Sequence, residues 1–139
     1  MPMIGKILLV DDEPHVRRYL AMLAKTTLGQ VEILEAADGR EALALYPVHR
    51  PDLVLLDINM VDSNGLETLQ ALRTLDPGAV VVMLTAVNVR HTVDEAEALG
   101  AAGYLLKELP FEEMGRALSA LVENVFGRED SQAGPGPSA

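Results

Sequence analysis

Lys6-Ile-Leu-Leu-Val-Asp-Asp12 is a short aliphatic run that ends abruptly in two carboxylates. Two further aliphatic runs, residues 53–56 and residues 79–84, also end at a polar side chain, Asp57 and Thr85 respectively. Continuously apolar runs of this length are typical of strands that are buried on both faces of a parallel sheet. We therefore expect three central strands whose carboxyl ends carry polar residues.

Segments with helical periodicity separate these runs. Asp38 with Glu41, and Asn64 with Glu67, form the capping pattern that begins a helix, and we expect the first of these helices to end before Pro47. The other expected helices are marked by Val16, Leu20, Leu23 and Ala24, by residues 89–99, and by Met114, Ala117, Leu118, Leu121, Val122 and Val125.

Two weaker strand patterns complete the alternation of strands and helices. Residues 31–36 and residues 104–106 are mixed or short, as edge strands are. Strict alternation implies right-handed crossovers and a parallel sheet with helices on both faces. With the second and fifth strands outermost, the order is 2-1-3-4-5, a common doubly wound arrangement. We therefore expect an α/β fold, a flavodoxin-like three-layer sandwich.

The composition narrows the class of protein. The chain has 139 residues, no cysteine and a net charge of −10, so disulfides and thiolate metal sites are excluded and a basic nucleic-acid footprint is lacking. No apolar run approaches the length of a membrane span, and a cytoplasmic location is expected. Residues 1–126 are expected to form one domain, and residues 127–139, rich in glycine and proline, a flexible tail or the start of a linker.

The polar residues that follow the strands predict a single site. Asp11, Asp12, Asp57, Thr85 and Lys107 all come at carboxyl ends of strands, where ligands bind in open α/β sheets. Any one of them alone is more often a loop or helix-cap residue. Three clustered carboxylates favour a hard divalent cation such as Mg²⁺, and an aspartate can act as a nucleophile toward a phosphoryl group.

These motifs together resemble the receiver domain of bacterial two-component response regulators over residues 4–126. The resemblance implies that Asp57 accepts a phosphoryl group from a phosphohistidine on a sensor histidine kinase or a histidine phosphotransfer protein. The motifs that carry it are Leu8-Leu-Val-Asp-Asp12, Asp57-Ile-Asn-Met60 with Gly65, Leu84-Thr-Ala86 and Gly103-Tyr-Leu-Leu-Lys107.

The same resemblance assigns ligands for Mg²⁺ or Mn²⁺. It implies that Asp12, Asp57 and the backbone carbonyl of Asn59 bind the ion, and that Asp11 acts through water. It also implies that Lys107 contacts the acyl phosphate.

The resemblance further implies a conformational switch and not an enzyme that turns over substrate. Thr85 would move to hydrogen-bond the phosphoryl group, and Tyr104 would turn inward behind it. The face formed by the fourth helix, fifth strand and fifth helix would then bind a downstream effector or an attached output domain, with homodimerisation on phosphorylation as a further expectation.

Two positions depart from the common receiver pattern. Val61 replaces a proline, and Lys107 is followed by Glu108-Leu109-Pro110 instead of directly by proline. The second departure resembles receivers attached to LuxR-type helix-turn-helix domains. The chain is therefore interpreted either as a stand-alone regulator or as a receiver cut from a longer transcription factor.

Particular residues disfavour three alternatives to a phosphorylated receiver. A haloacid-dehalogenase-type phosphatase needs an acid where Asn59 stands, and a flavodoxin-like cofactor site would be repelled by Asp11-Asp-Glu13. A degenerate receiver that only binds proteins is disfavoured because every acceptor, acid, hydroxyl and lysine position is intact.

The lifetime of the acyl phosphate depends on residues near Asp57. Val87, two residues after Thr85, is apolar and cannot orient an attacking water by hydrogen bonding, so slow hydrolysis is predicted. Asn59 is expected to tune the lifetime as well.

Overall fold

The protein is a five-stranded parallel sheet sandwiched between helices, in a computed structural model that describes residues 4–60, 64–85 and 90–127. The strand order is β2-β1-β3-β4-β5, which confirms the expected doubly wound arrangement. The strands are β1 Lys6–Val10, β2 Glu32–Ala36, β3 Leu53–Asp57, β4 Val81–Thr85 and β5 Gly103–Leu106. The helices are α1 Pro14–Leu28, α2 Gly39–His49, α3 Gly65–Leu75, α4 Arg90–Ala98 and α5 Phe111–Val122, followed by a π-helical turn, η1 Glu123–Gly127.

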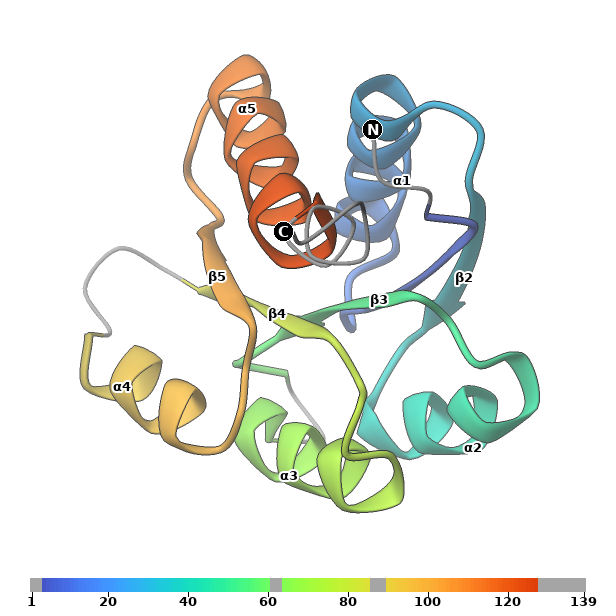
Figure 1. The fold of residues 1–139 in the computed structure, drawn as a ribbon, viewed down its shortest axis with the longest axis vertical. Helices are drawn as coiled ribbons and strands as arrows, with labels where there is room; N and C mark the ends of the chain where they lie inside the picture. Colours follow the sequence, from blue (N-terminus) through green and yellow to red (C-terminus); the bar gives the residue numbers. More distant parts are fainter. Residues whose placement is uncertain (1–3, 61–63, 86–89, 128–139) are drawn as a thin grey trace, which may run out of the picture.

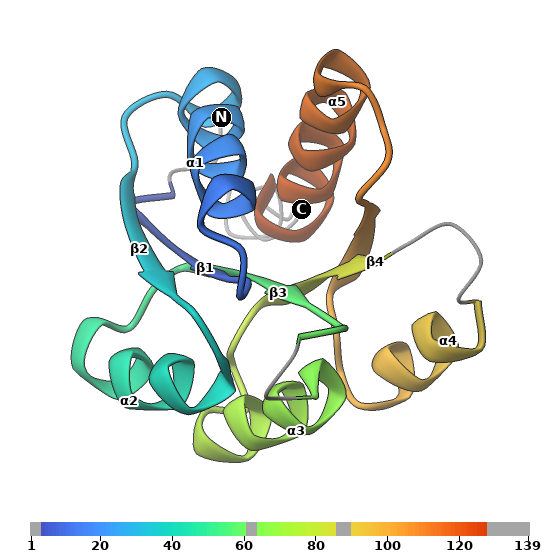
Figure 2. The same cartoon turned by 180° about the vertical axis from the view of Figure 1, so that it is seen from behind.

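The helices form two layers on opposite faces of the sheet. Helices α1 and α5 pack together on one face, and α2, α3 and α4 cover the other (Figures 1 and 2). Successive residues of a strand point to opposite faces, so Leu9 joins a core under α1 and α5, whereas Leu8 and Val10 join a second core under α2, α3 and α4. The sheet therefore separates two hydrophobic cores that share no buried residue.

Strand burial follows the sequence pattern. All residues of β3 and β4 are buried, whereas β2 and β5 contain exposed positions, as expected for edges.

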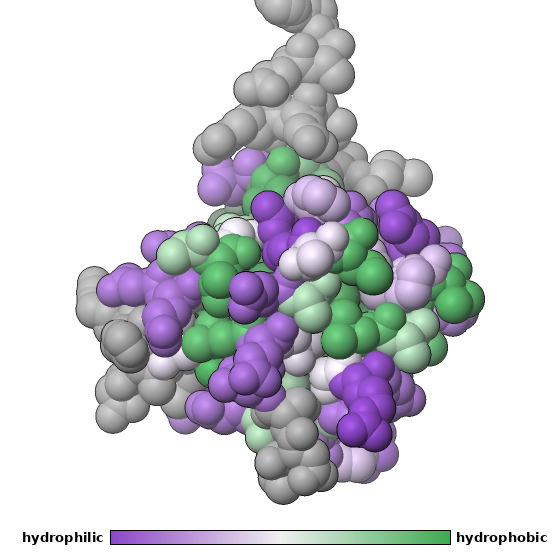
Figure 3. Space-filling view, turned by 90° about the horizontal axis from the view of Figure 1, so that it is seen from below, coloured by the Kyte–Doolittle hydropathy of each residue, from purple (hydrophilic) through white to green (hydrophobic). Residues whose placement is uncertain are grey.

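Seen from the side of α2, α3 and α4, hydrophobic residues form separate groups among hydrophilic ones (Figure 3). Val48 of α2 and Leu75 of α3 are among the exposed large hydrophobic residues. No helix in the described part of the chain is long and apolar enough to cross a membrane.

The expected end of the second helix was wrong. Helix α2 continues through Pro47 to His49. The proline falls in the last turn, where its missing N–H removes only the bond to the Leu43 carbonyl, so the cost of a proline in mid-helix is largely avoided. Arg50, in the left-handed conformation with φ 49°, ends the helix by donating its N–H to the Tyr46 carbonyl at 2.8 Å.

The predicted helix starts are confirmed. The Asp38 carboxylate accepts a hydrogen bond from the Glu41 N–H at 2.8 Å, and the Asn64 side chain accepts one from the Leu66 N–H at 2.8 Å. Glu41 in turn accepts a hydrogen bond from the N–H of Ala37. Both caps therefore place the helices that follow the second and third strands.

The last helix ends earlier than its apolar stripe predicts. Regular α5 stops at Val122, and Val125 lies in the π-helical turn η1. Val125 and Phe126 line a small apolar void together with Leu53 and Val80, and Phe126 packs against the core under α1 and α5. The wider turn thus brings the end of the described chain onto the amino ends of β3 and β4. Of the expected tail, only Gly127 lies within the described residues.

Candidate functional site

The site lies at the carboxyl ends of the central strands. Val10 of β1 pairs with Leu56 of β3, so Asp11 and Asp57, each the next residue along its strand, come side by side. Asp57 itself pairs with Leu84 on β4, and Thr85 with Leu106 on β5. The parallel register therefore brings together the residues that the sequence separates widely.

Asp57 is buried, with 2% of its surface exposed, and both of its carboxylate oxygens accept hydrogen bonds. Its Oδ1 accepts from the backbone N–H of Asn59 at 3.2 Å, and its Oδ2 accepts from the Nζ of Lys107 at 3.1 Å. Burial raises the pKa of Asp57 to about 6, although the hydrogen bond and the charge of Lys107 act to lower it. The group is thus a desolvated carboxylate held in one orientation.

Lys107 connects Asp57 to Asp11. Its Nζ lies 3.5 Å from Oδ2 of Asp11, a residue with no exposed surface, whose Oδ1 accepts a hydrogen bond from the Glu13 N–H at 2.9 Å. Burial acts to lower the pKa of Lys107, but its contacts with Asp57 and Asp11 outweigh that effect and raise the pKa above its ordinary value. Lys107 therefore stays charged between the two acids.

Asp11, Asp12 and Asp57 form a cluster that fits a divalent cation. One carboxylate oxygen from each lies within 4.8 Å of the other two. Asp12 is partly exposed, which leaves the cluster a side open to solvent. One lysine against three carboxylates leaves excess negative charge in a largely buried place, and an all-oxygen donor set suits Mg²⁺ or a similar hard ion. The predicted carboxylates are therefore brought together.

The loop after β3 is held against the start of α3. Asn59 and Asn64 form an isolated antiparallel bridge, and Gly65 donates its N–H to the Ile58 carbonyl at 2.9 Å. A Cβ on Gly65 would collide with the Asp57 carbonyl and lie 2.6 Å from the Ile58 Cα, so the backbone approaches as closely as only glycine permits. This close contact fixes the position of the Asp57 backbone relative to the start of α3.

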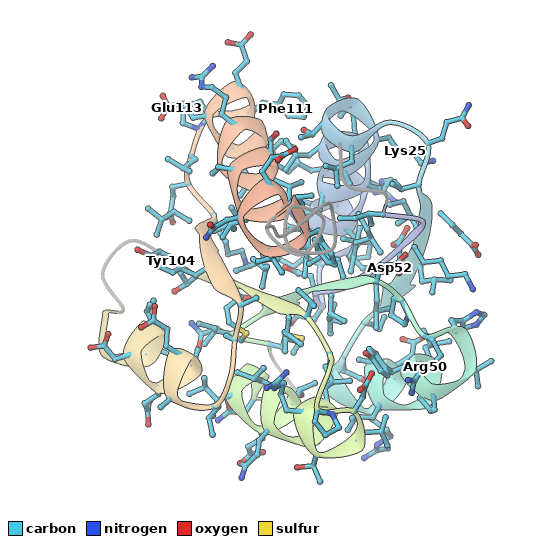
Figure 4. The ribbon with its side chains drawn as sticks, in the orientation of Figure 1. Lys25, Arg50, Asp52, Tyr104, Phe111 and Glu113 are labelled. Atoms are coloured by element: carbon cyan, nitrogen blue, oxygen red, sulfur yellow. The ribbon has the colours of Figure 1, made fainter. Side chains whose placement is uncertain are left out.

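The two residues expected to move on activation occupy different surroundings. Thr85 is buried at the end of β4, and its carbonyl accepts a hydrogen bond from the Lys107 N–H at 2.8 Å. Tyr104 is 44% exposed, and its ring extends outward from β5 (Figure 4). The inward position expected for Tyr104 on activation is therefore not the one in this structure. Val87 and Val61 lie outside the described residues.

Comparison with known proteins decides the family. The model of the response regulator receiver domain family matches residues 7–119. The chain belongs to this family. Receiver domains of this family are signalling switches of two-component systems rather than enzymes in the usual sense.

Individual relatives of the receiver agree with this assignment. The chain is 40% identical to Protein CcdB of Bacillus subtilis over 78% of the chain and 88% of CcdB. It is 38% identical to the nitrate/nitrite response regulator protein NarL of Escherichia coli over 81% of the chain, but spans only 52% of NarL. The fold matches a chain of the CheX–CheY–BeF₃–Mg²⁺ complex of Borrelia burgdorferi, with a TM-score of 0.77 and 30% identity, over 88% of this protein and 89% of that chain.

One contact at the receiver site was not anticipated from the sequence. Arg17 of α1 donates from Nη1 to the Asp11 carbonyl at 2.6 Å and from Nε to the Glu35 carboxylate at 2.7 Å. Nothing in the spacing of these three residues marks the contact, because one acceptor is a backbone carbonyl and the other comes from a different strand.

The usual proline after Lys107 is absent, and the described residues contain no cis peptide bond.

Proposed function

We propose that this receiver accepts a phosphoryl group on Asp57 from the phosphohistidine of a sensor histidine kinase or a histidine phosphotransfer protein. The observation that carries the proposal is the burial of Asp57 within reach of two further carboxylates and of Lys107. A desolvated carboxylate with an open metal cluster beside it has the groups that positioning and charge neutralisation of a phosphoryl group require.

The transfer exchanges one bond to phosphorus for another. The N–P bond of the donor breaks and its electron pair stays on the imidazole, while an oxygen of Asp57 forms the new O–P bond of an acyl phosphate. Lys107, already hydrogen-bonded to Asp57, is placed to transfer its bond to a phosphoryl oxygen. The Asp57 carboxylate must be ionised to attack; burial raises its pKa to about 6 in the metal-free protein, and a bound cation would lower the pKa and favour the ionised form.

Asp12, Asp57 and the Asn59 carbonyl would hold Mg²⁺ or Mn²⁺, with Asp11 acting through water. The ion supplies positive charge against the phosphoryl oxygens, which Lys107 alone cannot balance. The cluster of Asp11, Asp12 and Asp57 supports a cation site here, as does the 30% identity to a chain of the CheX–CheY complex that was solved with BeF₃ and Mg²⁺.

Phosphorylation is proposed to change the α4–β5–α5 face. Thr85 would turn its hydroxyl to the phosphoryl group and Tyr104 would leave its exposed position to pack behind it. A shift from mostly inactive to mostly active requires about 5 kcal/mol of differential interaction. The face would then bind a downstream effector, a second copy of the chain or an attached output domain in the cytoplasm. An attached output domain is supported by the partial match to NarL, of which the chain spans 52%.

Intact-mass measurement after incubation with acetyl phosphate and Mg²⁺ tests the proposal. The wild-type chain is expected to gain one phosphoryl group, and Asp57→Asn none. Asp94→Asn, which removes an exposed carboxylate of α4, is the matched control and should label like the wild type. Full labelling of Asp57→Asn would refute the assignment of the acceptor, and full labelling in excess chelator would refute the metal requirement.

A further inference from the structure

Arg17 makes two short contacts beside the carboxylate cluster. Its side chain is 14% exposed, although it carries a full charge. The guanidinium joins the Asp11 carbonyl, at 2.6 Å, to the Glu35 carboxylate of β2, at 2.7 Å. A planar guanidinium that donates to two acceptors at once loses much of its rotational freedom. Arg17 therefore connects α1 to the partly exposed Glu35 of β2 and to the loop that follows β1.

The carbonyl that Arg17 contacts belongs to the peptide group between Asp11 and Asp12. The rest of Asp11 is already fixed: its N–H donates to the Ala36 carbonyl at 3.1 Å, and its carboxylate accepts from Glu13 and Lys107. Fixing the carbonyl as well sets the plane of the peptide from which Asp12 begins. The bond from Arg17 is thus one of the constraints on the backbone from which the Asp12 side chain reaches the cluster.

We infer that Arg17 is a positioning residue for the cation site, acting through the peptide that precedes Asp12. The inference rests on the proposed metal role of the carboxylate cluster and extends it to a residue outside the cluster. Glu35 contributes in two ways, because it orients the guanidinium and also offsets its positive charge close to a site for a cation. Residues that orient metal ligands from outside the coordination shell commonly change metal affinity by about 10- to 100-fold.

Charge alone predicts the opposite effect. A guanidinium near a cation site repels the ion, so removal of Arg17 would strengthen Mg²⁺ binding if electrostatics were its only contribution. Loss of positioning weakens binding instead. The sign of the change in affinity therefore separates the two roles.

The test is the Mg²⁺ dissociation constant of the full chain, measured by isothermal titration calorimetry. For Arg17→Ala we expect binding about tenfold weaker than in the wild type. Arg17→Lys keeps the positive charge but loses the planar arrangement of donors with which the guanidinium contacts two acceptors, and this variant should also bind Mg²⁺ more weakly. Arg18→Ala, an exposed position on the same helix with the same change in charge, should leave the dissociation constant within about twofold.

Thermal denaturation without metal shows that each variant is folded at the titration temperature. Equal or tighter Mg²⁺ binding by both folded Arg17 variants would overturn the inference, and a wild-type chain that binds no Mg²⁺ would overturn the metal site and the inference together. As a second readout, the rate of labelling by acetyl phosphate in Arg17→Ala should recover at saturating Mg²⁺. A rate that stays low there would overturn the positioning role. A wild-type chain that binds Mg²⁺ but is never labelled would instead contradict the proposed phosphoryl acceptance.

Discussion

The ammonium group of Lys107 lies 3.1 Å from the carboxylate of Asp57, yet this pairing does not offset the cost of burying Asp57. Burial raises the pKa of Asp57 to about 6 from an ordinary value of 3.8, against the lowering effect of Lys107. Desolvation by burial is the largest effect on this pKa and outweighs Lys107, and the negative charge of Asp11, which contacts the same lysine, adds a smaller rise. Without a cation, the site is therefore a source of instability at neutral pH.

Replacement of Asp57 by asparagine is expected to stabilise the metal-free protein at pH 7.5. Since the folded-state pKa is raised, the stability associated with this carboxyl is complete below a pH of about 3.8 and is lost as the pH rises through about 6. Asp57→Asn should raise the free energy of unfolding by about 1–3 kcal/mol at pH 7.5, and by less at pH 5. Urea denaturation in chelator measures both values.

Asp94→Asn serves as the control for the loss of one negative charge at an exposed position. A gain in stability that was the same at pH 5 and pH 7.5, or that Asp94→Asn reproduced, would contradict the role assigned to burial of Asp57.

Alanine at Gly65 is expected to disturb the site through the backbone. Its Cβ would meet the Asp57 carbonyl and would lie 2.9 Å from the Ile58 carbonyl oxygen, and neither group can rotate away. We expect a loss of about 1–3 kcal/mol in the free energy of unfolding and slower labelling by acetyl phosphate. Gly78→Ala, whose Cβ would meet only the Asp76 side chain at 3.4 Å, should change little. Equal effects of the two substitutions would argue against a close approach at Gly65.

The phenol of Tyr46 should titrate at unusually high pH. Burial, followed by the hydrogen bond to Asp76 at 2.8 Å, raises the pKa of Tyr46 to about 12. The stability that this proton confers is complete below a pH of about 10 and is lost as the pH rises toward about 12. Absorbance titration at alkaline pH should show a component near 12 that is absent in Tyr46→Phe and present in Tyr104→Phe. A component that survives in Tyr46→Phe would show that it belongs to another tyrosine.

A polar residue at position 87 is predicted to shorten the lifetime of the acyl phosphate. An apolar Val87 cannot hold an attacking water by hydrogen bonding, whereas Val87→Asn or Val87→Glu can. We expect faster loss of the phosphoryl group, measured by intact mass after removal of the donor. Val87→Ala, which stays apolar, is the control. An unchanged rate in both polar variants would exclude this explanation for slow hydrolysis.

The arrangement of the strands could be predicted from the sequence because burial dictates composition. β3 and β4 are buried throughout and are aliphatic up to their last residue, whereas the exposed positions of β2 mark an edge. Once the order is known, parallel pairing brings Asp11, Asp12 and Asp57 together without further information. The carboxylates were therefore predictable as a group.

The sequence does not predict the continuation of α2 through Pro47 or the contacts of Arg17, because both depend on the packing of the folded chain. Pro47 predicts the end of a helix, but in the last turn it removes only one hydrogen bond, and the apolar ring of Tyr46 beside it is buried. Arg17 was missed because its two acceptors, a backbone carbonyl and Glu35, are assembled only by the fold. A local sequence pattern indicates the secondary structure of a segment and which of its residues are buried, but not which side chains of separate helices and strands come into contact.

The separation of the interior into two hydrophobic cores has a consequence for how such a domain can diverge. Because Leu9 packs only under α1 and α5 and Leu8 only under α2, α3 and α4, substitutions in the two cores should combine additively in their effects on stability. One helical layer can then accumulate changes, and so acquire a different binding partner, while the other layer is conserved. Asp57 belongs to β3, which both layers share, whereas Asp11 and Asp12 follow β1 and depend also on Arg17 of α1, so changes in the α2–α3–α4 layer should disturb the carboxylates least.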